Sequence, residues 1–107
     1  LPRKVERGAL KAALAARLRA GDVIVVEELR AAERKTKTVA EQLRRLGAVG
    51  KTLVIDVTLD ENFAASARNI AGVRIVQSGR LTARDVMDTK RLVATKAAVL
   101  RLQEVLG

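Results

Sequence analysis

The sequence predicts an α/β fold, a single three-layer domain in which helices flank a mainly parallel four-stranded sheet. Three observations support this prediction. Short apolar runs rich in β-branched residues recur at 23–29, 51–57, 73–76 and 91–95, and such runs are typical of buried strands. Segments with helical periodicity and helix start signals separate the runs. The runs are apolar on both faces, as parallel strands are when right-handed crossover helices cover both sides of a sheet.

The first predicted helix runs from about Pro2 to Ala20. Proline fits the first turn because its missing N–H has no intrahelical partner there, and Gly21 is a typical helix end. Two faces of this helix are apolar: a leucine stripe (Leu10, Leu14 and Leu18) and a face of small residues (Val5, Ala9, Ala12, Ala13 and Ala16). We expect the alanines to approach the sheet closely, the first two turns to project beyond the body, and the later turns to be packed.

The remaining helices are predicted from their caps. Thr36 or Thr38 is expected to cap a helix through TVAEQLRRLG, with Glu41 completing a capping box for Thr38 and Gly47 ending the helix. The segment QSGR at 77–80 is expected to be a turn. Three further caps precede short or closing helices: Asp60 before ENFAASARNI, Thr82 in LTARDVMDT, and Thr95 before KAAVLRLQEVLG.

The charge of the chain indicates its class of partner. The 107 residues are enough for one domain with a modest core, and their formal net charge is +9. Residues 1–20 carry six cations and one acid, so more than half of the surplus lies on the opening helix. Such a positive charge favours a polyanionic partner. Nucleic acid is the first candidate, and an acidic membrane surface is the second. No apolar run is long enough to cross a bilayer, so no membrane-spanning role is expected.

The residue types that the chain lacks narrow its function further. It contains no Cys and no His, which removes thiolate metal sites and the usual general base. Ser66 and Ser78 therefore have no partner for a hydrolytic triad, and no dinucleotide or Walker glycine pattern follows a predicted strand. Phe63 is the single aromatic residue, so RNA contacts are expected at phosphate and sugar rather than through base stacking. No cofactor or metal is expected.

The opening helix begins with the cations Arg3, Lys4, Arg7 and Lys11, opposed by Glu6 alone. A cation there is unfavourable by about 0.3–1 kcal/mol, because the amino end of a helix already carries a partial positive charge. Phosphates outside the helix would make the arrangement favourable. The cluster is therefore predicted to bind RNA, with an ordinary solvated helix face as the alternative.

A second cluster, Arg34, Lys35 and Lys37, lies just before a predicted helix. Cations beside free backbone N–H groups can form an anion site, and an ordinary exposed loop is the alternative. Arg44 and Arg45 lie near a helix carboxyl end, where cations are favourable without any functional role. Weaker candidates for RNA contact end or flank short elements: Arg68, Asn69, Arg80 and Arg84.

An acidic set offers a different function. Glu27 and Glu28 follow the first predicted strand, Asp56 ends the second, and Thr95 ends the fourth with Lys96 beside it. Carboxylates at the carboxyl ends of parallel strands lie where α/β folds build sites, so they could hold Mg²⁺ and accept a phosphoryl group, as in response-regulator receiver domains. The net charge and the single helix between the acidic pair and Asp56 disfavour this alternative. A third alternative is a scaffold domain that contacts acidic membrane surfaces.

Two long stretches resemble the large-subunit ribosomal protein "L-four" family. LPRKVERGALKAAL is similar to the segment with which that family re-enters its globular domain after a long internal loop. The stretch from DENFAASARN to LQEVL is similar to the family's carboxyl-terminal third. The pieces that carry the resemblance are LPRK at 1–4, KTK at 35–37, SARN at 66–69 and LVATKAAV at 92–99.

The resemblance implies a compact α/β domain with a four-stranded sheet and a structural, non-enzymatic function. It implies binding of large-subunit rRNA, support of subunit assembly, and contact with neighbouring ribosomal proteins. The expected location is the cytoplasmic ribosome, with an organellar ribosome as the alternative. Some bacterial members of the family also repress their own operon by binding messenger RNA, so the chain's own mRNA leader is a further expected partner.

The chain also departs from the family pattern. The family's amino-terminal strand and extended loop are absent, so the sequence is expected to be a fragment. In LTARDVMDT, Thr82, Ala83 and Arg84 stand where the family usually has an asparagine, a large apolar residue and an aromatic. The family's basic helix start carries over best, onto Arg3, Lys4 and Arg7.

Overall fold

The computed structural model describes residues 3–48 and 50–106, without the side chains of residues 3–5. Helices and strands alternate along the chain, as the sequence predicts. In chain order the elements are α1 (Arg3–Ala20), β1 (Val23–Val26), α2 (Thr36–Arg45), β2 (Thr52–Asp56), α3 (Glu61–Arg68), β3 (Val73–Gln77), the 3₁₀ turn η1 (Ser78–Arg80), α4 (Ala83–Met87), β4 (Arg91–Thr95) and α5 (Lys96–Leu106).

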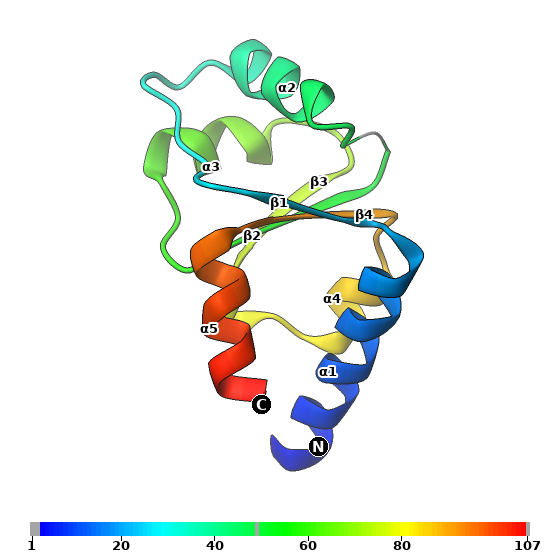
Figure 1. Cartoon of the computed structure of the whole chain (residues 1–107). Coiled ribbons are helices and arrows are strands. Elements are labelled where there is room, and N and C mark those ends of the chain that lie inside the picture. The colour runs from blue at the N-terminus through cyan, green and yellow to red at the C-terminus, as the bar shows by residue number, and fades with distance from the viewer. Residues whose placement is uncertain (1–2, 49, 107) are drawn as a thin grey trace.

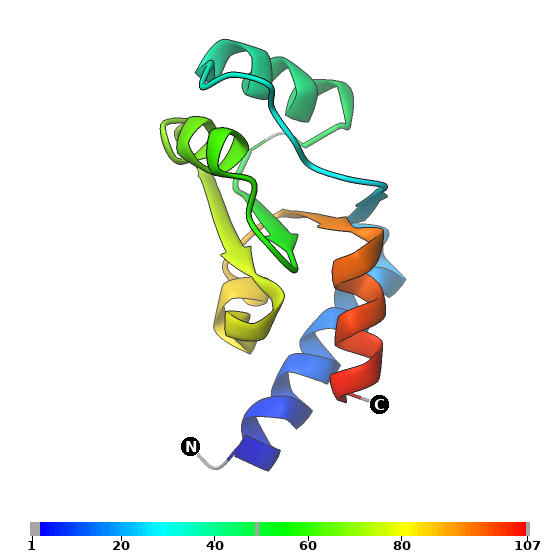
Figure 2. The same ribbon diagram turned by 90° about the vertical axis from the view of Figure 1, so that its left-hand side faces the viewer.

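The four strands form one sheet in the order β1-β4-β2-β3, and every neighbouring pair is parallel. The last strand in the sequence thus lies between the first and the second. Helices α2 and α3 cover one face of the sheet, and α1, α4 and α5 lie on the other (Figures 1 and 2). The predicted three-layer α/β architecture is confirmed.

The core consists of two apolar clusters, one on each face of the sheet. Successive strand residues point to opposite faces, so Leu53 and Ile55 belong to one cluster while Val54 between them belongs to the other. The side chains that complete the first cluster come mainly from the layer of α1, α4 and α5, among them Leu10, Leu81, Val86 and Ala98. Those that complete the second include Leu29, Val39, Leu43, Phe63 and Ala67.

Three of the predicted caps are present. The Asp60 carboxylate accepts a hydrogen bond from the Phe63 amide at 3.0 Å, and Thr82 forms a full capping box with Asp85. The Thr95 hydroxyl accepts from the amide of Ala98 at 3.2 Å. These side chains satisfy amide groups that the first turn of a helix leaves without partners. They fix where α3, α4 and α5 begin.

The predicted cap of α2 is wrong. The helix begins at Thr36 with Lys35 as its N-cap, no side chain makes a cap hydrogen bond, and Thr38 lies inside the first turn. Burial of Val39 and Leu43 against the sheet sets the start of α2 without a side-chain cap. The predicted strand at 23–29 is also too long, because β1 ends at Val26 and the chain then leaves the sheet to bury Leu29.

The predicted small-residue face of α1 is buried only in part, and the side chain of Val5 lies outside the described residues. Ala9, Ala12 and Ala16 are exposed, and so is Leu18, whose exposed fraction is 62%. The inward face instead carries Leu10, Ala13 and Leu14, which pack against the first core cluster. A buried leucine removes more apolar surface from water than an alanine does. The helix therefore turns the first part of its leucine stripe inward.

Candidate nucleic-acid interface

Two cations of the opening cluster, Arg7 and Lys11, have described side chains, and both lie on the surface. Arg7 is exposed and has no ion pair or hydrogen bond within the part of the chain that the structure describes. Lys11, one turn later, is also exposed. Arg3 and Lys4 lie within the helix, but their side chains are outside the described set. The one acid among them, Glu6, is half-buried and forms no ion pair with a described residue.

The second predicted cluster lies where the chain enters α2: Arg34 and Lys35 lie on the loop that precedes the helix, and Lys37 lies in its first turn. Arg34, Lys35 and Lys37 are all exposed. The Lys35 ammonium is 3.0 Å from the Glu33 carboxylate, and both side chains are about two-thirds exposed, so the pair contributes little to stability. Arg34 and Lys37 have no partner among the described residues. All three cations can therefore turn toward an external phosphate.

This loop is held in place by the start of α3. The Asp60 carboxylate accepts a hydrogen bond from the Ala31 amide at 3.1 Å in addition to capping its own helix. The Asn62 side chain donates to the Ala32 carbonyl at 3.1 Å. The hydrogen bond from the Phe63 amide, followed by that from the Ala31 amide, lowers the pKa of Asp60 below its ordinary value. Burial opposes them with a smaller effect, and the nearby Arg30 guanidinium contributes the smallest lowering. These hydrogen bonds hold in place the backbone of the loop that carries Arg34 and Lys35.

The weaker candidates occupy different places. Arg68 and Asn69 end α3 and are exposed, and Arg80 is exposed at the end of η1. Arg84 on α4 lies 3.8 Å from Asp88, in an exposed pair. Helices α2 and α3 run alongside each other in the same direction (Figure 1). Arg68 therefore lies at the opposite end of that helical layer from the 34–37 cluster.

The two predicted basic clusters thus lie apart from each other, and Arg68 and Asn69 belong to neither. The start of α1 and η1 belong to the layer on one side of the sheet, and the 34–37 loop belongs to the layer on the other side (Figures 1 and 2). The molecule measures 39 × 24 × 23 Å, and these two groups lie toward opposite ends of it in both views. One short RNA segment cannot contact both groups without passing around the body.

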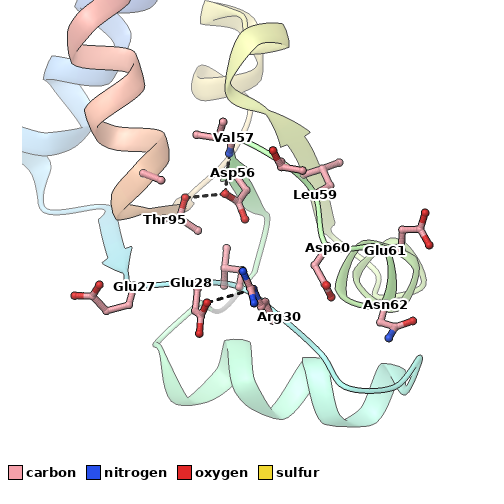
Figure 3. Close-up of a pocket in the computed structure, with 13 residues that line it drawn as sticks. Glu27, Glu28, Arg30, Asp56, Val57, Leu59, Asp60, Glu61, Asn62 and Thr95 are labelled. Carbon is pink, nitrogen blue, oxygen red and sulfur yellow. Dashed lines mark hydrogen bonds and ion pairs between the residues drawn. The ribbon is translucent and has the colours of Figure 1, made fainter.

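The acidic alternative has a real cleft but no metal-binding geometry. A cavity of about 660 Å³ opens at the carboxyl edge of the sheet and is lined by Glu27, Glu28, Asp56 and Thr95. Asp56 is already occupied, because it accepts from the Thr95 hydroxyl at 2.9 Å and from its neighbour's amide at 2.7 Å. Figure 3 shows Glu27 directed away from Asp56, and Glu28 pairs with Arg30 at 3.2 Å. No three acidic groups in the described residues could hold a metal ion, so the geometry gives the receiver-like alternative no support.

Three other arginines, which no sequence pattern distinguishes, have different surroundings in the structure. Arg17 and Arg91 both contact Asp22, at 3.2 and 2.6 Å, and so are engaged in structure. Arg101 on α5 is exposed and without a partner in the described chain, and it lines the same cleft as Arg7. The two lie far apart in the sequence, so no local pattern joins them.

No helix in the described part of the chain is both long and apolar enough to cross a membrane.

Comparison with known proteins agrees with the resemblance read from the sequence. Residues 1–105 match the ribosomal protein L4/L1 family. The chain is 44% identical over 107 residues to the large ribosomal subunit protein uL4 of Moorella thermoacetica, a match that covers 100% of this chain and 52% of the relative. The corresponding protein of Symbiobacterium thermophilum is 39% identical over 107 residues, with 100% and 52% covered.

A third relative, the large ribosomal subunit protein uL4 of Pelotomaculum thermopropionicum, is 42% identical over 105 residues, with 98% of this chain and 50% of the relative covered. The chain thus spans about half the length of the curated relatives that it matches. The family match extends over nearly the whole chain. The chain therefore belongs to the ribosomal protein L4/L1 family.

Proposed function

We propose that this chain is a structural part of the large ribosomal subunit that binds rRNA through phosphate contacts and supports subunit assembly. Its relatives are named as large-subunit ribosomal proteins, and the family is one of structural proteins rather than enzymes. The observation that carries the proposal is the exposed, unpartnered Arg7 at the start of α1. Arg7 follows Arg3 and Lys4 on the same helix, and those two lie in its first turn, where cations are unfavourable beside the helix dipole unless an anion outside the helix is close to them.

The separation of the two basic groups supports a role in assembly. The start of α1 and the 34–37 loop face different directions across the sheet (Figures 1 and 2). Each group would neutralise phosphates of a different rRNA segment, and the rigid core would fix the distance between them. Neighbouring ribosomal proteins would meet the faces that the RNA leaves open.

The same surfaces would account for binding to the chain's own mRNA leader. Phosphate contacts fix position and carry no direct sequence information, so a folded leader that presents phosphates at the same spacing would compete with rRNA. Competition between the two RNAs for the purified chain tests this part of the proposal. Simultaneous binding of both would contradict it.

The salt dependence of RNA binding tests the proposal as a whole. About four to six phosphate contacts would give a slope of roughly −3 to −5 for the logarithm of the association constant against the logarithm of salt concentration. The slope is measured by titrating the chain with fragments of large-subunit rRNA at several salt concentrations. An affinity that does not change between low and physiological salt would overturn the proposal.

Matched variants locate the contacts. Replacing Arg3, Lys4 and Arg7 with Ala should lower RNA affinity about tenfold at physiological salt and make the salt slope shallower by about two to three. The melting temperature should stay equal or rise, because the cations no longer oppose the helix dipole. The control replaces Arg19, Arg44 and Arg45 with Ala, which removes the same charge from exposed positions. An equal loss of RNA affinity in the control would show that only net charge matters.

A further inference from the structure

A cleft that the sequence did not predict lies between three elements on the α1 side of the sheet. Its volume is about 410 Å³, and it is lined by the start of α1, the η1 turn and the last turns of α5. Ligand-binding clefts commonly occupy about 300–1,000 Å³. The floor is aliphatic, with Leu10 and Leu81 buried and Leu102 and Leu106 half-buried. The cleft is therefore large enough for a small ligand and has an apolar surface on which one can lie.

Three polar groups in this cleft have no partner within the described chain. Arg7 from α1 and Arg101 from α5 both line it with exposed side chains that make no ion pair. Ser78 of η1 lines it too and is only 8% exposed, yet its hydroxyl makes no hydrogen bond with a described residue. Among the described residues, the Ser66 hydroxyl oxygen is the single side-chain polar atom that is both fully buried and without a hydrogen-bond partner. The unpartnered Ser78 hydroxyl is therefore not fully buried and can be reached from the cleft. This hydroxyl can therefore donate a hydrogen bond to a molecule in the cleft or accept one from it.

The cleft is not suited to a bare anion. Glu6 also lines it and has no ion pair among the described residues. A free phosphate or a lipid headgroup would gain from the two guanidinium groups but would be repelled by this carboxylate. A nucleotide can use all four groups, because it has phosphate oxygens, ribose hydroxyls, a base with a flat face, and amino groups that donate to a carboxylate.

We propose that this cleft binds one unpaired nucleotide of RNA whose base carries an exocyclic amino group. Arg7 and Arg101 would hold the flanking phosphates, and the Ser78 hydroxyl would bond to the ribose. The aliphatic floor would support the face of the base or sugar, and Glu6 would accept from the amino group. The inference rests on the proposed function and adds base recognition to a surface that otherwise contacts phosphates.

Hairpin RNAs with and without a bulge test the proposal. The full 107-residue chain is titrated, by fluorescence anisotropy at one salt concentration, with a paired hairpin and with the same hairpin carrying a single bulged A, C or U. Bulged A and C should bind about five- to tenfold more tightly than the paired hairpin, given the usual value of one base contact. Bulged U should bind more weakly than A or C because uracil has no exocyclic amino group.

Variants separate the cleft from general electrostatics. Arg101→Gln and Ser78→Ala should each remove most of the preference for the bulge, whereas Arg44→Gln, which loses the same charge as Arg101→Gln on α2, should leave it unchanged. Gly79→Leu provides a test without a charge change. A Cβ at Gly79 would meet no atom within 4 Å, so the larger side chain can be accommodated and would narrow the cleft that Gly79 lines. Circular dichroism of each variant would check that it is folded. Arg101 is exposed, so its replacement should leave the core intact.

The outcomes separate this inference from the proposed function. Equal affinity for bulged and paired hairpins overturns the nucleotide cleft and leaves phosphate binding standing. The cleft is also overturned if Arg101→Gln and Arg44→Gln have the same effect on both RNAs. If the chain binds no RNA even at low salt, the proposed function is wrong and the cleft proposal is overturned with it.

Discussion

Arg7 and Arg17 carry the same charge on the same helix, but their surroundings are opposite. Arg7 is exposed and unpartnered in the described chain. The Arg17 side chain is 23% exposed and donates to the carbonyls of Val86 and Met87 at 3.3 and 3.2 Å, to the carbonyl of Thr89, and to Asp22. One arginine is available to an external anion, and the other is part of the internal structure.

The contacts of Arg17 explain its difference from Arg7. The last turn of a helix leaves carbonyl groups without partners, and a cation there also interacts favourably with the helix dipole. Arg17 supplies this cation to α4 from a different helix, while Asp22 holds it together with Arg91. Net charge alone therefore does not make an arginine available to RNA; its side chain must also be free of internal partners.

The largest expected effect is on stability. Arg17→Ala removes the partners of three carbonyls and one carboxylate, so it should lower the free energy of unfolding by about 2 to 3 kcal/mol. Urea denaturation measures the change. Arg19→Ala, an exposed position in the last turn of the same helix, should stay within about 0.5 kcal/mol of the parent chain. Equal stability of the two variants would remove the distinction between structural and available arginines.

A smaller effect should appear at low pH in the loop that presents Arg34 and Lys35. Hydrogen bonds from the Phe63 and Ala31 amides lower the pKa of Asp60 in the folded chain. This contribution to stability is complete above the unfolded pKa of about 3.9 and is lost as the pH falls through the lower folded pKa. Hydrogen exchange at the amides of Ala31 and Phe63 should accelerate together over that range. The Ala98 amide, capped by a hydroxyl that does not titrate, is the control, and equal acceleration there would indicate global unfolding.

The smallest expected effect concerns Lys35, which is intermediate between Arg7 and Arg17. Its partner Glu33 is close and exposed, so Glu33→Gln should change the unfolding free energy by less than about 0.5 kcal/mol. RNA affinity should rise about twofold more than in Glu41→Gln, which changes the net charge equally from an exposed position on α2. Identical RNA affinities in these two variants would show that the ion pair does not restrain Lys35.

The fold could be predicted from the sequence because its signals are local. The run at 91–95 has the apolar centre Leu92–Ala94, follows Lys90 and ends at Thr95, the residue that caps α5. β4 has the same bounds. The caps formed by Asp60 and Thr82 depend on residues three positions apart. The buried face of α1 depends instead on how much apolar surface each face removes from water. The leucine and alanine stripes could both pack against the sheet, and tertiary packing decides which of them is buried. The start of α2 likewise follows from burial of Val39 and Leu43 and not from a capping side chain.

The site was less predictable because a residue's partners can lie far away in the sequence. Arg17 bonds to backbone carbonyls 69 to 72 positions later, and no pattern around Arg17 indicates this. Arg7 and Arg101 share a cleft only because α1 and α5 lie in the same layer (Figure 1). Exposure of Arg34, Lys35 and Lys37 could be expected from composition, but the anchoring of their loop by Asp60 and Asn62 requires the tertiary structure.

The order of the strands also governs how the chain can fold as it is synthesised. β4 pairs with β1 on one side and β2 on the other, so among the strands that the structure describes β1 has no neighbour until Arg91–Thr95 have been made. Of the described strand pairs, only β2–β3 can form earlier. A nascent chain stopped before β4 would leave an open sheet edge and two incomplete apolar clusters, the kind of surface that chaperones and proteases recognise. The sheet and both apolar clusters are therefore complete only once the last strand has been made.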